Sequence, residues 1–280
     1  MKWRIGDTTI TRVVELTSST IGNHILPQAT EDCIKAIDWI GPFVNDDHKL
    51  VLSFHSLIIE TESQTLVVDT CIGNDKDRTY PKWHQMQSSF LDDFAAAGFD
   101  RDTVDTVLCT HMHVDHVGWN TRLVGGAWEA TFPNARYLYA EEEWVHWQNE
   151  SQAEYGPVID DSVRPIFDAG LADLVSSDHQ VTTEVRLEST PGHTPGHVSV
   201  HITSQGEEAL ITGDMVHHPC QIAYPDWSTT ADVDPDQSAS TRARFLDLYA
   251  DRPVLVIGTH FSGPTAGKLV RDGDSYRLDY

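Results

Sequence analysis

Residues 110–118 read Thr-His-Met-His-Val-Asp-His-Val-Gly, which places three histidines and one aspartate within six residues. The stretch directly follows residues 103–109, whose apolar and β-branched side chains predict a buried strand. Side chains at the end of a rigid strand are held more precisely than side chains on a free loop. Imidazole together with carboxylate suits zinc, iron, manganese or cobalt, so the stretch indicates a metal site. A solvated histidine-rich turn is the alternative.

Other parts of the chain repeat this arrangement, in which an apolar strand ends in a metal-binding type of residue. Residues 65–69 end in Asp69, residues 208–214 end in Asp214, and residues 253–260 end in His260. Helices are predicted to begin at Ser88 or Ser89, at Asp160 or Asp161, and at Asp234. The two halves of the chain share this plan, which predicts two facing sheets, helices outside them, and a site where strand ends meet.

The composition restricts the partners that the protein can have. The chain of 280 residues is long enough for a large core, and we predict a single domain over residues 1–280. Its 43 acidic and 19 basic residues give a net charge of −24, which disfavours nucleic acid and membrane surfaces as partners. The simpler interpretation is that proteins of this lineage are generally acidic and that the charge has no functional meaning. No signal peptide, membrane segment or disulfide framework is expected, so the predicted location is cytoplasmic.

The candidate ligands suit a site with two metals. The residues of this type in the predicted turns and strand ends are His111, His113, Asp115, His116, His193, Asp214 and His260. Each metal needs three or four protein ligands, so seven candidates suit two ions that share one ligand. The order His-x-His-x-Asp-His, His, Asp, His resembles the metallo-β-lactamase superfamily, as does the Thr-Pro-Gly-His-Thr-Pro-Gly-His of residues 190–197. The resemblance covers residues 51–260 and implies a mixed α/β (α+β) fold, the four-layer αββα sandwich.

The resemblance also implies a role for each of these residues. It places His111, His113 and His193 on a first metal; Asp115, His116 and His260 on a second; and Asp214 between the two. The ions are expected to be two divalent metals, with zinc first and iron, manganese or cobalt as alternatives. His197 would be structural, and Asp69 matches a buried carboxylate of the family. From the residues themselves, we expect Asp69 to accept a hydrogen bond from a metal-ligating imidazole, because a charge at the end of an apolar strand needs a partner.

The predicted activity is a two-metal hydrolase that opens a lactone or carboxylic ester by attack of metal-bound hydroxide, with Asp115 transferring the proton. The sequence resembles most the branch of N-acyl-homoserine lactonases and methyl parathion hydrolase. Homoserine lactonases carry a tyrosine three residues after the bridging aspartate, where this chain has His217. His217 could donate to a developing oxyanion or tune Asp214, and a satisfied buried imidazole is the alternative. Tyr224 is a second candidate donor to the substrate carbonyl.

The loops of the chain indicate an apolar substrate. Five aromatic residues in loops are expected near the strand ends: Trp39, Phe43, Trp83, Trp119 and Trp227. Together they favour a small hydrophobic ester or lactone. Residues 37–43 could form a lid over the pocket, or a loop that its aromatic side chains pin to the core.

Several other functions fit the same sequence less well. A phosphotriester hydrolase is the second choice of substrate class. An iron-dependent oxidoreductase and a metal-stabilised binding protein without activity are the rivals from other classes. The expected absence of a signal peptide disfavours a β-lactamase. The acidic charge disfavours an RNA-processing enzyme, and the short C-terminal tail disfavours a thioesterase. A homodimer is expected from the resemblance alone.

Overall fold

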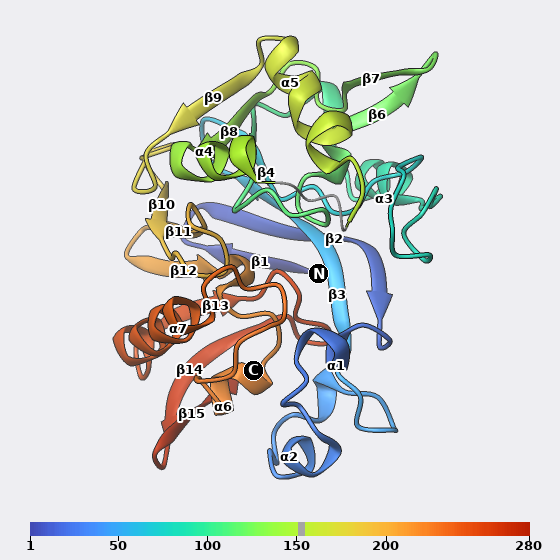
Figure 1. Ribbon diagram of the computed structural model, residues 1–280. Coiled ribbons are helices and arrows are strands. Elements are labelled where there is room, and N and C mark those ends of the chain that lie inside the picture. The colour runs from blue at the N-terminus through green and yellow to red at the C-terminus, as the bar shows by residue number, and fades with distance from the viewer. Residues whose placement is uncertain (151–154) are drawn as a thin grey trace.

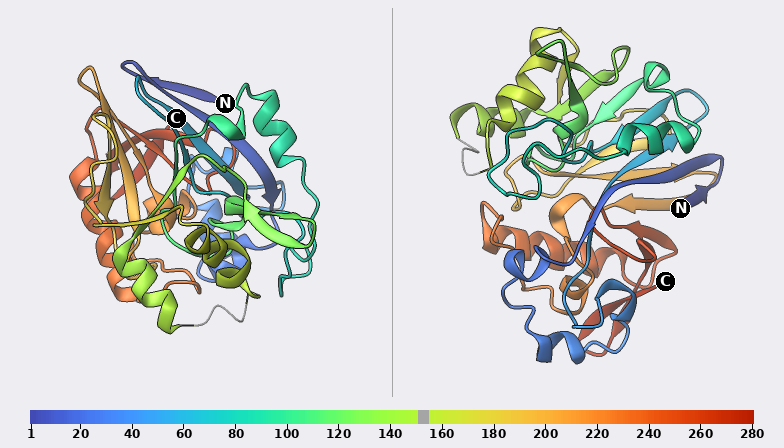
Figure 2. Two further views of the ribbon diagram at one scale, coloured as in Figure 1. Left: turned by 90° about the horizontal axis from the view of Figure 1, so that it is seen from above. Right: turned by 90° about the vertical axis from the view of Figure 1, so that its right-hand side faces the viewer.

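In a computed structural model, which describes residues 1–150 and 155–280, two β-sheets face each other and helices lie on their outer sides (Figures 1 and 2). The view from above in Figure 2 shows α7 outside one sheet and α3 outside the other. The predicted αββα sandwich is therefore confirmed. A separate hairpin joins β6 (Thr121–Val124) to β7 (Ala127–Ala130).

The first sheet contains seven strands in the order β1-β2-β3-β4-β5-β8-β9. Their bounds are β1 (Lys2–Ile5), β2 (Thr8–Ser18), β3 (Leu52–Glu60), β4 (Thr65–Val68), β5 (Thr106–Leu108), β8 (Arg136–Ala140) and β9 (Ala172–Val175). The pairs β4–β5, β5–β8 and β8–β9 are parallel. The carboxyl ends of these strands therefore share one edge of the sheet, and β4 and β5 lead there into Asp69 and residues 110–118.

The second sheet contains six strands in the order β10-β11-β12-β13-β14-β15. Their bounds are β10 (Val185–Ser189), β11 (Val198–Ser204), β12 (Glu207–Ile211), β13 (Val254–Ile257), β14 (Ala266–Asp272) and β15 (Ser275–Asp279). β12 and β13 are parallel. Their carboxyl ends lie together and lead into Asp214 and His260.

The helices are short apart from α4 and α7. Their bounds are α1 (Gly22–Ile25), α2 (Glu31–Lys35), α3 (Phe90–Ala96), α4 (Glu141–Asn149), α5 (Arg164–Asp168), α6 (Cys220–Ala223) and α7 (Pro235–Tyr249). The predicted start of α7 is confirmed, because Asp234 accepts a hydrogen bond from the backbone N–H of Gln237 at 2.9 Å.

Alternation along the strands separates the core into layers. Leu57 and Ile59 of β3 pack between the two sheets. Ile58 points to the opposite face and belongs to the same cluster as Phe90 and Phe94 of α3. On β12, Ala209 and Ile211 belong to the layer between the sheets and Leu210 packs in the layer that contains α7. Successive side chains of a strand point to opposite faces, so both faces of each sheet are buried.

The predicted start of α3 at Ser89 is confirmed, although neither serine caps a backbone N–H, and the predicted start of α5 at Asp160 or Asp161 is wrong. Ser89 precedes α3, but its hydroxyl donates to Asp93 Oδ2 at 2.6 Å and caps no backbone N–H, and the Ser88 hydroxyl binds Glu15. Before α5, one π-helical turn covers Ile159–Val163, so the helical segment begins ahead of both aspartates. Asp161 is buried there and pairs with Arg78 instead of capping a helix.

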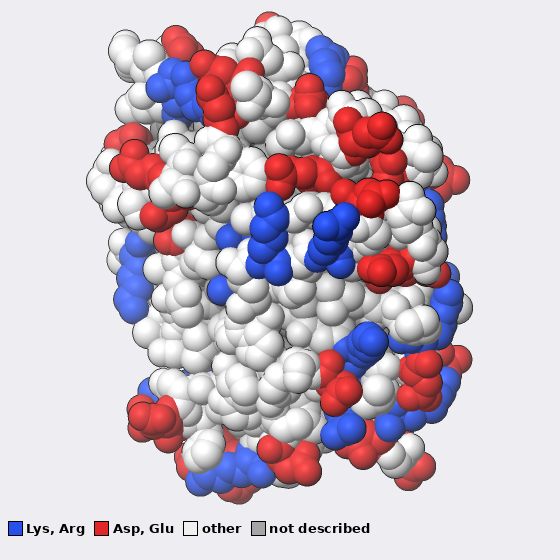
Figure 3. Space-filling model, turned by 180° about the vertical axis from the view of Figure 1, so that it is seen from behind, with Lys and Arg blue, Asp and Glu red and all other residues white. Residues whose placement is uncertain are grey.

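The surface carries charges of both signs. On the face shown in Figure 3, acidic and basic side chains are interspersed, and a largely uncharged area lies below two basic side chains near the middle of the view. The excess of acidic residues is therefore not gathered into a single patch on this face. Within the part of the chain that the structure describes, no helix is long and apolar enough to cross a membrane.

Candidate metal centre

The turn after β5 is held by Asp69, which follows β4. The Asp69 carboxylate accepts hydrogen bonds from the backbone N–H of Thr110 at 2.8 Å, from the Thr110 hydroxyl at 2.8 Å and from His116 Nδ1 at 2.9 Å. The predicted hydrogen bond from an imidazole to Asp69 is therefore confirmed, and the role of His116 as a metal ligand stays a prediction. Because Nδ1 of His116 donates to Asp69, its Nε2 atom faces Asp214 at 3.2 Å.

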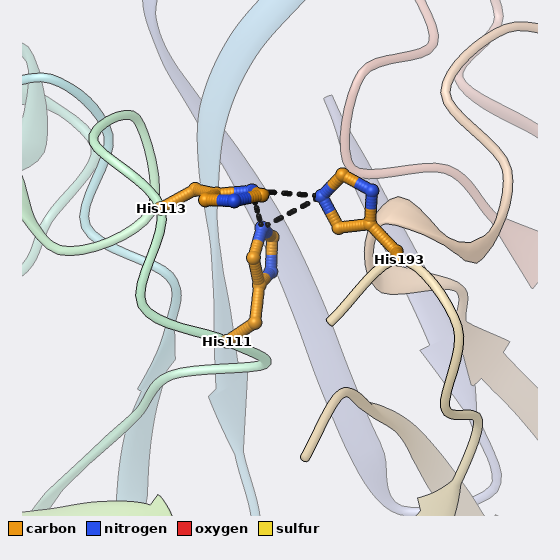
Figure 4. A group of neighbouring side chains, drawn as sticks. All are labelled: His111, His113 and His193. Atoms are coloured by element: carbon orange, nitrogen blue, oxygen red, sulfur yellow. Dashed lines mark hydrogen bonds between the residues drawn. The ribbon is translucent and has the colours of Figure 1, made fainter. Parts of the chain in front are cut away.

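Three imidazoles from the two halves of the chain converge at one point (Figure 4). His111 and His113 come from the turn after β5, and His193 comes from the turn between β10 and β11. His111 Nε2 lies 3.1 Å from His113 Nδ1 and 3.2 Å from His193 Nε2, and His113 Nδ1 lies 2.9 Å from His193 Nε2. All three residues are buried.

A second group of side chains lies beside the first. His116 Nε2 is 3.1 Å from His260 Nε2, and the Asp115 carboxylate is 3.5 Å from His260 Nε2. Asp214 contacts both groups: its Oδ1 is 3.2 Å from His260, and its Oδ2 is 3.2 Å from His116 and 3.5 Å from His193. The structure thus brings all seven predicted ligand residues together, with Asp214 between the two groups.

The donor set fits divalent metal ions. Each ring nitrogen in the triangle of His111, His113 and His193 points at two others, and hydrogen bonds alone cannot satisfy three converging nitrogens. The ligand atoms of a tetrahedral zinc ion, each about 2.0–2.1 Å from the metal, are about 3.3 Å apart. The observed separations of 2.9–3.2 Å are close to that spacing. These residues could hold one ion, and the group around Asp115, His116 and His260 could hold another.

The electrostatics of the site favour positive charge at its centre. Burial would raise the pKa of Asp214, but the imidazoles of His116, His217 and His260 hold that pKa well below its ordinary value. Burial would lower the pKa of His116, but Asp214 and Asp69 raise it well above its ordinary value, and the pKa of His260 is raised by Asp214 in the same way. The ionised carboxylate of Asp214 therefore favours a cation in either group of candidate ligands.

His197 positions Asp214 through the backbone. The backbone N–H of Asp214 donates to His197 Nε2 at 2.8 Å, and His197 Nδ1 donates to the carbonyl of Thr190 at 3.0 Å. Burial lowers the pKa of His197 to about 3, so the ring is neutral and can accept at Nε2. A Cβ on Gly213 would lie 2.5 Å from that nitrogen, and Gly213 has a φ of +56°, so only glycine allows this approach.

Two carboxylates that the sequence analysis missed also hold the site. Asp232 accepts a hydrogen bond from His193 Nδ1 at 2.7 Å. Glu143 of α4 accepts from the backbone N–H of Met112 at 2.9 Å and of Gly196 at 3.2 Å. Asp232 follows no apolar strand, so the strand-end pattern could not find it. The sequence did contain one indication that Glu143 is buried: Trp147 follows it by four residues and lies on the same face of α4.

A cavity of about 320 Å³ opens over the two groups. Asp115, His193, Asp214, His217 and His260 form its polar side. The remaining wall is largely apolar, with Ile21 and Ile25 at α1, Leu52 and Phe54 at β3, and Trp83. The described residues that line it include no lysine or arginine. The cavity can therefore accept an uncharged, apolar molecule next to the candidate metal ligands.

The predicted aromatic lining is mostly wrong. Trp83 lines the cavity, but Trp39, Phe43, Trp119 and Trp227 do not. Phe43 is fully buried and packs edge-on against Phe261, with ring centroids 6.2 Å apart. The predicted lid at residues 37–43 is also wrong, because Ile37, Ile40 and Phe43 are buried in the core beside α7, and the pinned loop is what the structure shows. Ile21 and Ile25 at α1 form part of the wall instead.

The two candidate substrate donors differ in position. His217 lines the cavity, and its Nε2 lies 3.0 Å from Asp214 Oδ2. Burial lowers the pKa of His217, and Asp214 opposes this shift. Tyr224 stacks on Trp227 at a centroid distance of 4.3 Å and does not line the cavity, so the prediction that it contacts the substrate carbonyl is wrong.

Sequence comparison identifies the family. A model described as the metallo-β-lactamase superfamily matches residues 53–260, which is most of the chain. The chain belongs to the metallo-β-lactamase superfamily. A search of curated proteins found no match to the sequence. Membership confirms the predicted resemblance and places the chain among metal-dependent hydrolases.

Several solved structures share the fold over nearly the whole chain. The hydrolase AbOPH is 23% identical, with a TM-score of 0.81 over 100% of this chain and 96% of that one. The dizinc quorum-quenching lactonase AidC is 19% identical, with a TM-score of 0.80 over 99% and 96%. AiiA of B. thuringiensis, in a structure with N-decanoyl-L-homoserine at its active site, is 16% identical, with a TM-score of 0.62 over 92% and 94%.

Proposed function

We propose that this protein is a two-metal hydrolase that opens a lactone or a carboxylic ester. In this proposal His111, His113 and His193 hold one divalent ion. Asp115, His116 and His260 hold the other, and Asp214 lies between the two ions. The observation that carries the proposal is the convergence of these seven side chains from both halves of the chain beneath one apolar cavity.

The ions would supply hydroxide at neutral pH and polarise the carbonyl group that is attacked. Asp115 is the residue that we assign to the proton. It is the more exposed carboxylate of the site, with 14% of its side chain accessible against 4% for Asp214, and it lines the cavity. Its carboxylate can hold the proton beside His260 and deliver it to the leaving alkoxide.

His217 is assigned to the substrate oxygen. Its Nε2 lies 3.0 Å from Asp214 Oδ2 on the wall of the cavity, so a proton on Nε2 is directed at Asp214 in the structure. With ions bound to the Asp214 oxygens, this N–H would be free to donate to the charge that develops on the substrate oxygen. In this role it would stand where homoserine lactonases have a tyrosine. The substrate would then be oriented by one polar side of the cavity and packed against the other.

The wall of the cavity supports an uncharged substrate. Ile21, Ile25 and Trp83 offer apolar surface, and the described lining includes no lysine or arginine to pair with a carboxylate or phosphodiester anion. A neutral phosphotriester fits the same wall, so a phosphotriester hydrolase is the second candidate. Zinc is the ion to test first, because three imidazoles and the spacing of their nitrogens suit it.

The test is a substrate panel with protein reconstituted with zinc. The panel contains N-hexanoyl-homoserine lactone, an aryl acetate, a neutral phosphotriester and a β-lactam. We expect kcat/KM for the lactone or the aryl ester to exceed that for the other two by at least tenfold. A higher value for the phosphotriester would favour the second candidate. A higher value for the β-lactam, or no turnover of any substrate by zinc-loaded protein, would refute the proposal.

A further inference from the structure

The turn of residues 229–232 touches the site from outside the sheets. On one side of the turn, the Asp232 carboxylate accepts from His193 Nδ1 at 2.7 Å. On the other side, Thr230 and Ala231 line the cavity. No predicted strand or motif pointed to this turn, and its carboxylate is one that the proposed function does not use.

Asp232 is built into this position. Its side chain is 1% exposed. Its Oδ1 also accepts from the Thr229 hydroxyl at 2.8 Å, and its Oδ2 accepts from the Thr229 backbone N–H at 3.0 Å. These hydrogen bonds hold the carboxylate in one orientation where it meets the imidazole.

The backbone fixes the turn relative to His193 and to the cavity wall. The N–H of Val233 donates to the carbonyl of His193 at 2.9 Å, and the N–H of Asp234 donates to the carbonyl of Gly192 at 3.0 Å. The N–H of Thr230 donates to the carbonyl of Ile25, at the end of α1, also at 2.9 Å. The turn thus joins one candidate metal ligand to the segment that forms the apolar wall.

A carboxylate on Nδ1 determines what the other nitrogen of the ring can do. Because Nδ1 of His193 carries the hydrogen that Asp232 accepts, its Nε2 presents a lone pair to the point where His111 and His113 converge. An anionic partner also makes the imidazole a better electron donor to a cation. His116 has the same kind of partner in Asp69, from the other half of the chain.

We propose that Asp232 is a positioning residue that orients His193 and strengthens the binding of the first metal ion through it. This inference rests on the proposed metal site but not on the substrate. The partner of His193 comes from the same turn as part of the cavity wall. The turn that orients His193 therefore also lines the cavity in which the substrate would bind.

The test compares Asp232→Asn and Asp232→Ala with the parent protein, using zinc affinity rather than turnover as the measurement. Metal-free protein is titrated with zinc against a competing chelator, and the absorption bands of the cobalt(II) form are recorded. Asp226→Asn is the matched control, because Asp226 is an exposed carboxylate nearby whose loss changes the net charge equally.

We expect Asp232→Asn to weaken the affinity of one zinc ion about 10- to 100-fold and to shift the cobalt spectrum. Asp232→Ala should weaken it further, because the asparagine carbonyl can still accept from Nδ1 and alanine cannot. Asp226→Asn should stay within about twofold of the parent. The melting temperature of each metal-free variant shows whether the variant is folded.

Three results would overturn the inference. The first is a zinc affinity within twofold of the parent for both Asp232 variants. The second is a lower melting temperature of the metal-free Asp232→Ala variant with an unchanged zinc affinity, which would make Asp232 a stabilising residue only. The third is a parent protein that binds no zinc, which would refute the metal site as well. A parent that binds two zinc ions but hydrolyses no ester would refute the proposed activity and leave this inference intact.

Discussion

The Glu143 carboxylate accepts a hydrogen bond from the backbone N–H of Met112 at 2.9 Å, in the middle of the turn that carries His111 and His113. Its other oxygen accepts from the N–H of Gly196, three residues after His193. The indole N–H of Trp147 donates to the same carboxylate at 2.6 Å. One buried side chain on α4 therefore fixes the two turns whose imidazoles form the first group of ligands.

Replacement of Glu143 by glutamine should loosen this connection. The amide would place a donor against the N–H of Met112 or of Gly196, which leaves a buried N–H without an acceptor. We expect a loss of about 2–3 kcal/mol in the free energy of unfolding, together with weaker zinc binding. Urea denaturation and zinc titration measure the two effects. Glu141→Gln is the control, since Glu141 is exposed on the same helix, and equal effects in both variants would contradict the assignment.

Chelation should destabilise the protein. Asp214 and the imidazoles around it are buried, and without a cation their charges and lone pairs are incompletely compensated. An ion that binds the folded state alone adds about 2.7 kcal/mol when its concentration is 100 times its dissociation constant. We therefore expect EDTA to lower the melting temperature by several degrees and added zinc to restore it. An unchanged melting temperature, with metal removal verified, would refute the metal site.

His217 should matter for the chemical step. We expect His217→Phe to lower kcat for the preferred ester about 100-fold, because the variant lacks the N–H that donates to the developing oxyanion. His217→Tyr restores a donor at this position and should recover part of the loss. Steady-state kinetics with zinc content measured in parallel separates this effect from metal loss. Full activity of the phenylalanine variant would leave only a structural role for His217.

Lys76 predicts a dependence of stability on pH. The buried Lys76 and Arg78 share one carboxylate, that of Asp161, which Arg78 holds with two hydrogen bonds. Burial lowers the pKa of Lys76 from 10.5 to about 7. Between these two pH values the unfolded chain binds the extra proton, so this group should make the fold more stable as the pH rises, by at most about 1.4 kcal/mol per pH unit.

Urea denaturation at pH 7 and at pH 9.5 measures this contribution. Lys76→Met should lose the gain in stability that the parent shows between the two pH values. Lys82→Met, which removes an exposed lysine, should keep it. The prediction fails if Lys76→Met and the parent respond to pH in the same way.

The sequence predicts which side chains the structure brings together, because most of them follow a local signal. An apolar run that ends in Asp69, Asp214 or His260 marks both a strand and the residue at its carboxyl end. The partner of Asp69 follows from the same logic, since a carboxylate in that position needs a hydrogen-bond donor. In a sandwich of two sheets, such strand ends meet at one edge.

The parts that the sequence does not predict depend on contacts between distant segments. Asp232 reaches His193 across 39 residues, and Glu143 reaches Gly196 across 53. Ile21 and Ile25 of the apolar wall lie at α1, a helix of four residues that is too short to show a helical period in the sequence. Phe43 was expected at the cavity from its residue type, but its packing against Phe261 buries it in the core instead.

The most direct test of the account is the number of metal ions that the folded chain binds. Metal-free protein is saturated with zinc, freed of excess ion by gel filtration, and analysed by inductively coupled plasma mass spectrometry. The two groups of ligands around Asp214 predict two zinc ions per chain, and Asp214→Ala should reduce this number. A saturated parent protein with less than one ion per chain would contradict the two-metal site on which the proposed hydrolase depends.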